Sequence, residues 1–138
     1  MAKILVVDDS SVYRKELVAL LSSDGHLTIE ASDGLDGLIV ARAERPDVVI
    51  SDIMMPTIDG FGLVRALRED PELSATRVIF CTANYNEQET KTLARACQVG
   101  FVLMKPCEPV VILKAVEQVL AGVPESAASP SEQFDQEH

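Results

Sequence analysis

The chain has 138 residues, a length that suits one domain with a short appendage. Its composition, 47% hydrophobic and 25% charged, is that of an ordinary globular domain and excludes disorder of the whole chain. The formal net charge of −10, from 12 basic and 22 acidic residues, does not suit a nucleic-acid binder, which needs a basic surface for phosphate contacts.

Short apolar runs mark the expected strands. The apolar run Lys3–Val7 predicts a buried strand, and the alternation of Leu27, Ile29 and Ala31 with polar residues predicts a strand near the edge of a sheet. Three further apolar runs predict strands at residues 48–50, 78–80 and 101–104.

A helical spacing of apolar residues follows each expected strand. It predicts helices at residues 12–21, 35–43, around 64–67, at 87–97 and at 109–120. In the second of these helices the predicted apolar stripe consists of Leu35, Leu38, Ile39 and Ala43, and Pro46 ends the helix.

Strands and helices therefore alternate along the chain. This alternation predicts a parallel sheet covered on both faces and joined by right-handed crossovers. For a sheet of this size we expect the flavodoxin-like α/β fold, a doubly wound (βα)5 sheet with strand order 2-1-3-4-5. We expect the domain to span residues 1–121. Residues 122–138, rich in Ser, Ala, Pro and acids, predict a disordered acidic tail or a linker.

Polar side chains stand where the expected strands end. Asp8 and Asp9 follow the first strand, Asp52 the third, Thr82 the fourth and Lys105 the fifth. Ligands of such sheets bind beyond the carboxyl ends of the strands, so we expect these residues to meet near strands 1 and 3. Neighbouring carboxylates need a compensating cation, and oxygen ligands favour Mg²⁺. A metal, a lysine and a hydroxyl are groups that stabilise phosphoryl transfer to an aspartate.

Four segments together resemble the CheY-like family of response regulator receiver domains of two-component systems. They are ILVVDDS, SDIMMPTIDGF, CTA and LMKP, in this order at the ends of strands, within a resemblance that covers about residues 2–120. The resemblance implies Mg²⁺-dependent phosphorylation by a sensor histidine kinase or a phosphotransfer protein, and slow loss of phosphate by hydrolysis. Such a domain catalyses both steps on itself without being a classical turnover enzyme.

The resemblance also implies a role for each of the three aspartates at the strand ends. Asp52 is the expected phosphoacceptor. Asp8, Asp9 and Asp52 are the expected Mg²⁺ ligands, with Asp9 more direct than Asp8, and the backbone carbonyl of Met54 completes the set. Phosphorylation is expected to change contacts with a downstream effector protein or a fused effector domain, in a monomer or a phosphorylation-dependent dimer.

On the last two strands, the chain both follows the family and departs from it. Thr82 and Lys105 are expected to contact phosphoryl oxygens, and the Lys105–Pro106 bond is expected to be cis, as in the family. The family usually has an aromatic switch residue three positions before the lysine, but this chain has Val102 there. Phe101 is one residue earlier, and neighbouring residues of a strand point to opposite faces, so Phe101 need not substitute for that aromatic.

Three other functions share part of the pattern. An aspartyl-phosphate hydrolase would need a DxD pair after the first strand and a cap domain, whereas Asp8 and Asp9 are adjacent. An FMN-binding flavodoxin would need a Ser/Thr-rich phosphate loop where this chain has DDSS. The main alternative is a docking module of receiver fold that is not phosphorylated.

The remaining features concern location and context. The chain has no apolar run long enough to span a membrane, and because two acids interrupt its first apolar run from position 8, we expect no signal peptide. Cys81, Cys97 and Cys107 form no CxxC pair, which indicates reduced thiols in the cytoplasm. We expect either a free-standing receiver or the N-terminal receiver of a longer protein.

Overall fold

The computed structural model describes residues 1–83 and 86–122. Beyond Gly122, the predicted tail lies outside the described residues. Strands and helices alternate as the sequence predicts. In chain order they are β1 (Lys3–Val7), α1 (Ser11–Ser23), β2 (Leu27–Ala31), α2 (Gly34–Glu44), β3 (Val48–Ser51), α3 (Gly60–Glu69), β4 (Arg77–Thr82), α4 (Glu87–Ala96), β5 (Phe101–Met104) and α5 (Pro109–Ala121).

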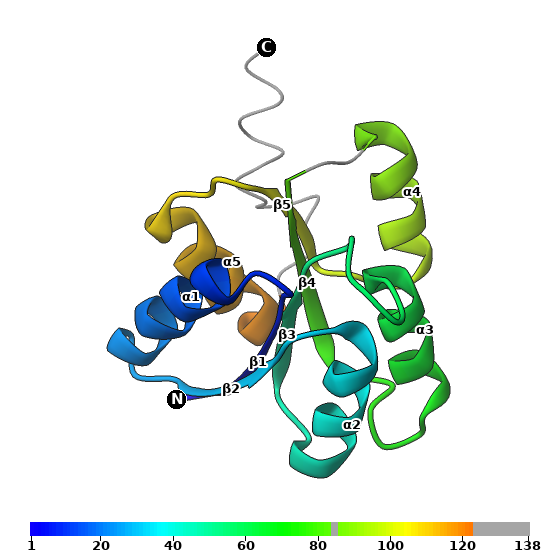
Figure 1. The fold of residues 1–138 in the computed structure, drawn as a ribbon, viewed down its shortest axis with the longest axis horizontal. Coiled ribbons are helices and arrows are strands. Elements are labelled where there is room, and N and C mark those ends of the chain that lie inside the picture. The colour runs from blue at the N-terminus through cyan, green and yellow to red at the C-terminus, as the bar shows by residue number, and fades with distance from the viewer. Residues whose placement is uncertain (84–85, 123–138) are drawn as a thin grey trace.

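All neighbouring strands are parallel, and their order is β2-β1-β3-β4-β5. This confirms the predicted flavodoxin-like α/β fold. Helices α1 and α5 cover one face of the sheet, and α2, α3 and α4 cover the other (Figure 1). The sheet is therefore buried on both faces, which is why its central strands are continuous apolar runs.

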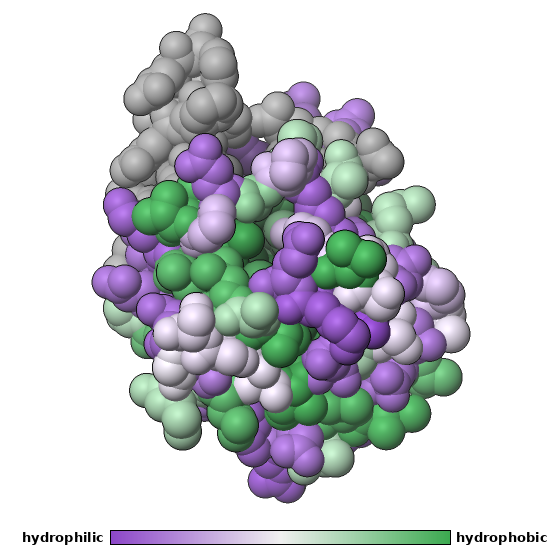
Figure 2. All heavy atoms as spheres, turned by 60° about the vertical axis from the view of Figure 1, so that its left-hand side comes forward, coloured by the Kyte–Doolittle hydropathy of each residue, from purple (hydrophilic) through white to green (hydrophobic). Residues whose placement is uncertain are grey.

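Alternate residues of β1 supply the two halves of the core. Leu5 and Val7 lie in the apolar cluster under α2, α3 and α4. Ile4 and Val6 lie in the cluster under α1 and α5. All four side chains are fully buried. The face that α1 and α5 turn to solvent mixes hydrophobic and hydrophilic residues (Figure 2).

The register of the strands brings the ends of β1, β3, β4 and β5 together. Val7 pairs with Ser51, so the next residue of each strand, Asp8 and Asp52, lie side by side. Thr82 pairs with Met104, the last residue of β5, so Lys105 follows directly after the position opposite Thr82. The sequence predicted this convergence from strand ends alone.

The predicted apolar stripe of the second helix is confirmed at Leu38 and wrong elsewhere. Leu35 and Ile39 are 49% and 56% exposed, Ala43 is also exposed, and α2 buries Gly34, Gly37 and Ala41 beside Leu38. A Cβ atom on Gly37 would lie 3.0 Å from both methyl groups of the Val7 side chain. Small residues therefore let α2 approach β1 closely, and its larger side chains turn outward.

None of the helices in residues 1–83 and 86–122 has the length and apolar character needed to cross a membrane.

Candidate functional site

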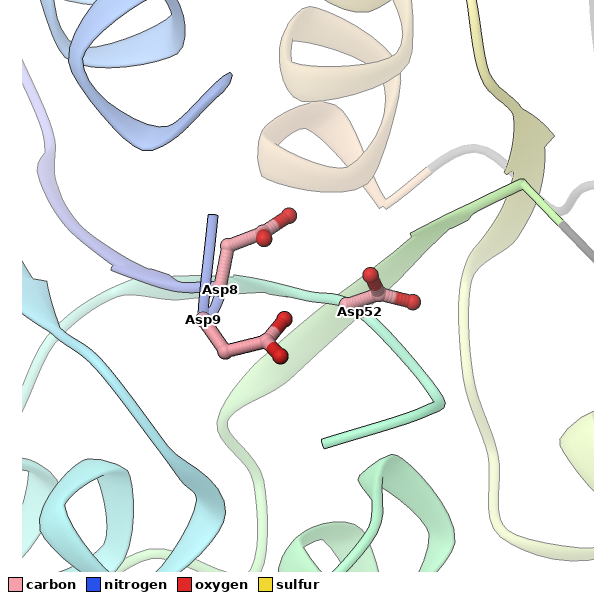
Figure 3. Close-up of side chains that lie close together, drawn as sticks. All are labelled: Asp8, Asp9 and Asp52. Carbon is pink, nitrogen blue, oxygen red and sulfur yellow. The ribbon is translucent and has the colours of Figure 1, made fainter. Parts of the chain in front are cut away.

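Three carboxylates gather at the carboxyl edge of the sheet. Asp8 and Asp9 come from the end of β1, and Asp52 follows β3 (Figure 3). One carboxylate oxygen from each lies within 4.8 Å of the others. Asp8 is 2% exposed and Asp52 9%, whereas Asp9 is exposed to solvent. The structure thus brings together the acidic residues that the sequence predicted, in unequal environments.

Backbone groups fix the position of Asp8. Its amide donates to the carbonyl of Ala31 at 3.2 Å, which extends the β1–β2 ladder by one residue. Its Oδ1 accepts a hydrogen bond from the amide of Ser10 at 2.8 Å. The guanidinium of Arg14 donates to the Asp8 carbonyl at 2.7 Å and to the Glu30 carboxylate at 2.9 Å. Arg14, which the sequence did not single out, ties the loop after β1 to β2.

Asp52 is held by the loop that follows it. Its Oδ1 accepts from the amides of Ile53 at 2.6 Å and Met54 at 3.3 Å. Helix α3 begins close by, at Gly60, whose amide donates to the Ile53 carbonyl at 2.7 Å. A Cβ atom on Gly60 would lie 2.6 Å from the Asp52 carbonyl oxygen, so a glycine is required for this approach. The Met54 side chain is 67% exposed beside the site.

Lys105 bridges the two buried carboxylates. Its Nζ donates to Asp8 Oδ2 at 2.7 Å and to Asp52 Oδ2 at 2.9 Å. Burial alone would lower the pKa of Lys105, but the hydrogen bonds and charges of Asp8 and Asp52 outweigh it, so that the pKa is raised. The Lys105 amide donates to the Thr82 carbonyl at 2.8 Å, and the Lys105–Pro106 peptide bond is cis, as expected.

Thr82 lies at the end of its strand, and Val102 and Phe101 lie on opposite faces of β5, as the sequence predicted. Thr82 is the last residue of β4 and is 1% exposed. Val102 is buried in the cluster under α2, α3 and α4, and Phe101 is buried in the cluster under α1 and α5. Phe101 therefore points to the opposite face from Val102 and does not take the place of the aromatic residue that Val102 replaces.

An aromatic residue that the sequence did not connect with the site lies against Lys105. The Tyr13 ring, from the first turn of α1, has its centroid 4.1 Å from Lys105 Nζ. In the sequence Tyr13 lies within the helix predicted at residues 12–21. Tyr13 and Lys105 are far apart along the chain, so no sequence pattern could predict their contact.

Comparisons with known proteins agree with this geometry. Residues 4–117 match the family described as response regulator receiver domain. Protein PilH of Pseudomonas aeruginosa is 42% identical over 123 residues, which are 88% of this chain and 100% of that protein. The nitrate/nitrite response regulator protein NarL of Escherichia coli K12 is 35% identical over 123 residues, which are 88% of this chain and 56% of that protein.

Solved structures give the same result. The chemotaxis response regulator CheY4 of Vibrio cholerae is 34% identical, with a TM-score of 0.80 over 86% of this chain and 98% of that one. The chain belongs to the response regulator receiver family. It is a receiver domain of the kind found in two-component response regulators, and phosphorylation-dependent signalling is the function of this class.

Proposed function

We propose that Asp52 is the phosphoacceptor of this receiver, with Asp8, Asp9, Asp52 and the Met54 carbonyl as Mg²⁺ ligands and Thr82 and Lys105 as contacts for the phosphoryl group. One observation carries the proposal. The Asp52 carboxylate lies beside an acidic pair and is bridged by Lys105 to Asp8, at the switch point of the sheet.

The donor set fits Mg²⁺. It consists of carboxylate oxygens close enough to share one ion, and small hard cations prefer oxygen ligands. One ammonium group leaves the charge of three carboxylates partly uncompensated. Bound Mg²⁺ would supply the missing positive charge and stabilise the charge that develops on phosphoryl oxygens. The exposure of Asp9 leaves room for water in its coordination sphere.

The chain's own residues hold the acceptor ready. The amides of Ile53 and Met54 fix Asp52 Oδ1, which leaves the carboxylate in one orientation. An Asp52 oxygen forms the new bond to phosphorus, the phosphorus–nitrogen bond to the donor histidine breaks, and the imidazole takes a proton. Lys105 and the Thr82 hydroxyl then donate to phosphoryl oxygens. Attack of water on phosphorus releases phosphate and restores Asp52.

The proposed partners follow from this chemistry. The phosphodonor is a sensor histidine kinase or a phosphotransfer protein, and the receiver of the signal is an effector protein or a fused domain. The net charge of −10 argues against nucleic acid as a partner. We assign this function to residues 1–121, with residues 122–138 as tail or linker. We propose that the protein acts in the cytoplasm. The protein acts as a monomer or as a phosphorylation-dependent dimer.

Intact-mass measurement tests the assignment. The protein is incubated with acetyl phosphate and Mg²⁺, and any phosphoryl adduct is mapped to its peptide. We expect an adduct at Asp52 that requires Mg²⁺, no adduct on Asp52→Asn, and a slower Mg²⁺-dependent reaction on Asp9→Asn, which keeps the acceptor. A stable adduct on Asp52→Asn refutes the assignment. A protein that takes neither phosphate nor beryllofluoride, which mimics the acyl phosphate, is instead a docking module of receiver fold.

A further inference from the structure

The Lys105 ammonium has a third neighbour besides Asp8 and Asp52. Its Nζ lies 4.1 Å from the centroid of the Tyr13 ring, well within the range in which a cation is attracted to the negative face of an aromatic ring. Tyr13 belongs to α1, and Lys105 follows β5. The contact therefore connects α1 with the phosphoacceptor edge of the sheet.

The Tyr13 ring is itself held in place. Its amide donates to the Oγ atom of Ser10, the N-cap residue of α1, at 3.2 Å. Its hydroxyl is hydrogen-bonded to Cys81 Sγ on β4 at 2.8 Å. Burial, and then the neighbouring Cys81, raise the pKa of the Tyr13 hydroxyl, so the side chain remains a neutral phenol. The backbone of Tyr13 is thus held at the start of α1, and its hydroxyl is held on Cys81, the residue before Thr82.

A lysine side chain has four flexible carbon–carbon torsions. Each must be restricted if the ammonium is to occupy one position before the reaction. Asp8 and Asp52 attract it only while their carboxylates are free. The Tyr13 ring offers an attraction that does not depend on either carboxylate. Preorganised charge stabilises a transition state better than charge that must move into place during the reaction.

Building on the proposed phosphotransfer to Asp52, we propose that Tyr13 is a positioning residue, whose ring face holds the Lys105 ammonium where it meets the incoming phosphoryl group. The hydrogen bond to Cys81 fixes the ring to the strand that carries Thr82. A purely structural Tyr13 would instead fill space beside Leu17, Cys107 and Ile112, which line the small depression next to it. The two roles differ in one property, the charge distribution of the ring face.

Substitutions at Tyr13 separate the two roles through the rate of adduct formation with acetyl phosphate and Mg²⁺. Tyr13→Leu removes the ring face and is expected to lower the rate about two- to thirtyfold, which is the range that a cation–π contact supplies. Tyr13→Phe keeps the face and is expected to retain most of the rate. Val12→Ala changes an exposed residue of the same helical turn and serves as the control.

A series of fluorinated phenylalanines at position 13 provides the second test. Fluorine withdraws negative charge from the ring face and hardly alters its shape, so the rate is expected to fall stepwise from Tyr13→Phe as fluorine atoms are added. This series remains informative if Tyr13→Leu does not fold. A rate that does not change along the series overturns the proposal.

Proton NMR of the metal-free protein gives a readout that needs no phosphorylation. The ring current of Tyr13 should shift the ε-methylene protons of Lys105 upfield in the native protein and in Tyr13→Phe, but not in Tyr13→Leu. An unshifted Lys105 signal in the native protein overturns the contact. If the native protein takes neither phosphate nor beryllofluoride while the shift is present, the assignment of Asp52 fails and the Tyr13–Lys105 contact stands.

Discussion

Replacing Lys105 with methionine is expected to destabilise the metal-free protein by about 2–4 kcal/mol. Methionine keeps an unbranched apolar stem and removes the charge. The ammonium of Lys105 lies 2.7 Å from Asp8 and 2.9 Å from Asp52, whose side chains are 3% and 11% exposed. The substitution therefore leaves two nearly buried carboxylates facing each other without their shared cation.

The magnitude follows from the surroundings of these carboxylates. Removal of one partner from a buried ion pair costs about 3–5 kcal/mol. The Lys105 side chain is 14% exposed, so water screens the pair slightly. The amides of Ser10 and Ile53 continue to stabilise one oxygen of each carboxylate. Both effects lower the expected loss from that range to about 2–4 kcal/mol.

Urea unfolding in EDTA and in Mg²⁺ measures the loss. In the proposed site, Mg²⁺ would bind only the folded protein, add stability by mass action and compensate the same carboxylates as Lys105. Mg²⁺ should therefore stabilise Lys105→Met more than it stabilises the native protein. Lys114→Met, at an exposed position of α5, is the matched control and should change little in either buffer. Equal losses for Lys105→Met in EDTA and in Mg²⁺ would falsify the reasoning.

The loss of stability caused by Lys105→Met should depend on pH with a definite sign. The folded-state pKa of Lys105 is raised, because the hydrogen bonds to Asp8 and Asp52 outweigh the effect of burial. The ammonium therefore contributes its full stability below the unfolded-state pKa of about 10.4 and loses it as pH rises through the folded-state pKa. Lys105 should therefore stay protonated through the neutral range, and the difference in unfolding free energy between the native protein and Lys105→Met should not change there. This difference should fall only in strongly alkaline buffer, where Lys105 loses its proton.

Two further predictions follow from other residues. Gly60→Ala should destabilise the protein by about 2 kcal/mol or more and slow adduct formation, because its Cβ atom would lie 2.6 Å from the carbonyl oxygen of Asp52. Gly62→Ala, whose Cβ atom would lie 3.4 Å from the nearest atom, should instead be neutral or stabilise the same helix by up to about 1 kcal/mol, as urea unfolding would show. Cys81 should resist alkylation in the native protein near neutral pH, because burial raises the pKa of its thiol to about 12; iodoacetamide labelling and peptide mapping check this, and rapid labelling of the folded protein contradicts it.

The sequence alone predicted the fold and the convergence of polar residues at one edge of the sheet. Five apolar runs such as Lys3–Val7, each followed by a helical stripe, indicate a parallel sheet covered on both faces, and a sheet of this size favours the doubly wound arrangement. In such a sheet the strand ends meet at one edge, so the positions of Asp8, Asp52 and Lys105 directly after strands are enough to predict that they meet. The alternation of side chains along a strand likewise gave the opposite faces of Val102 and Phe101.

The rotation of each helix, and with it the contacts between individual side chains, follows from tertiary packing. The buried face of α2 contains Gly37 rather than Ile39, because close approach to β1 favours small residues over large ones. The rotation of α1 over the sheet places Tyr13 against Lys105, and no local pattern relates two residues so far apart in the chain. Side-chain contacts of this kind depend on the packing of whole elements, whereas the pattern of a sequence specifies the elements themselves.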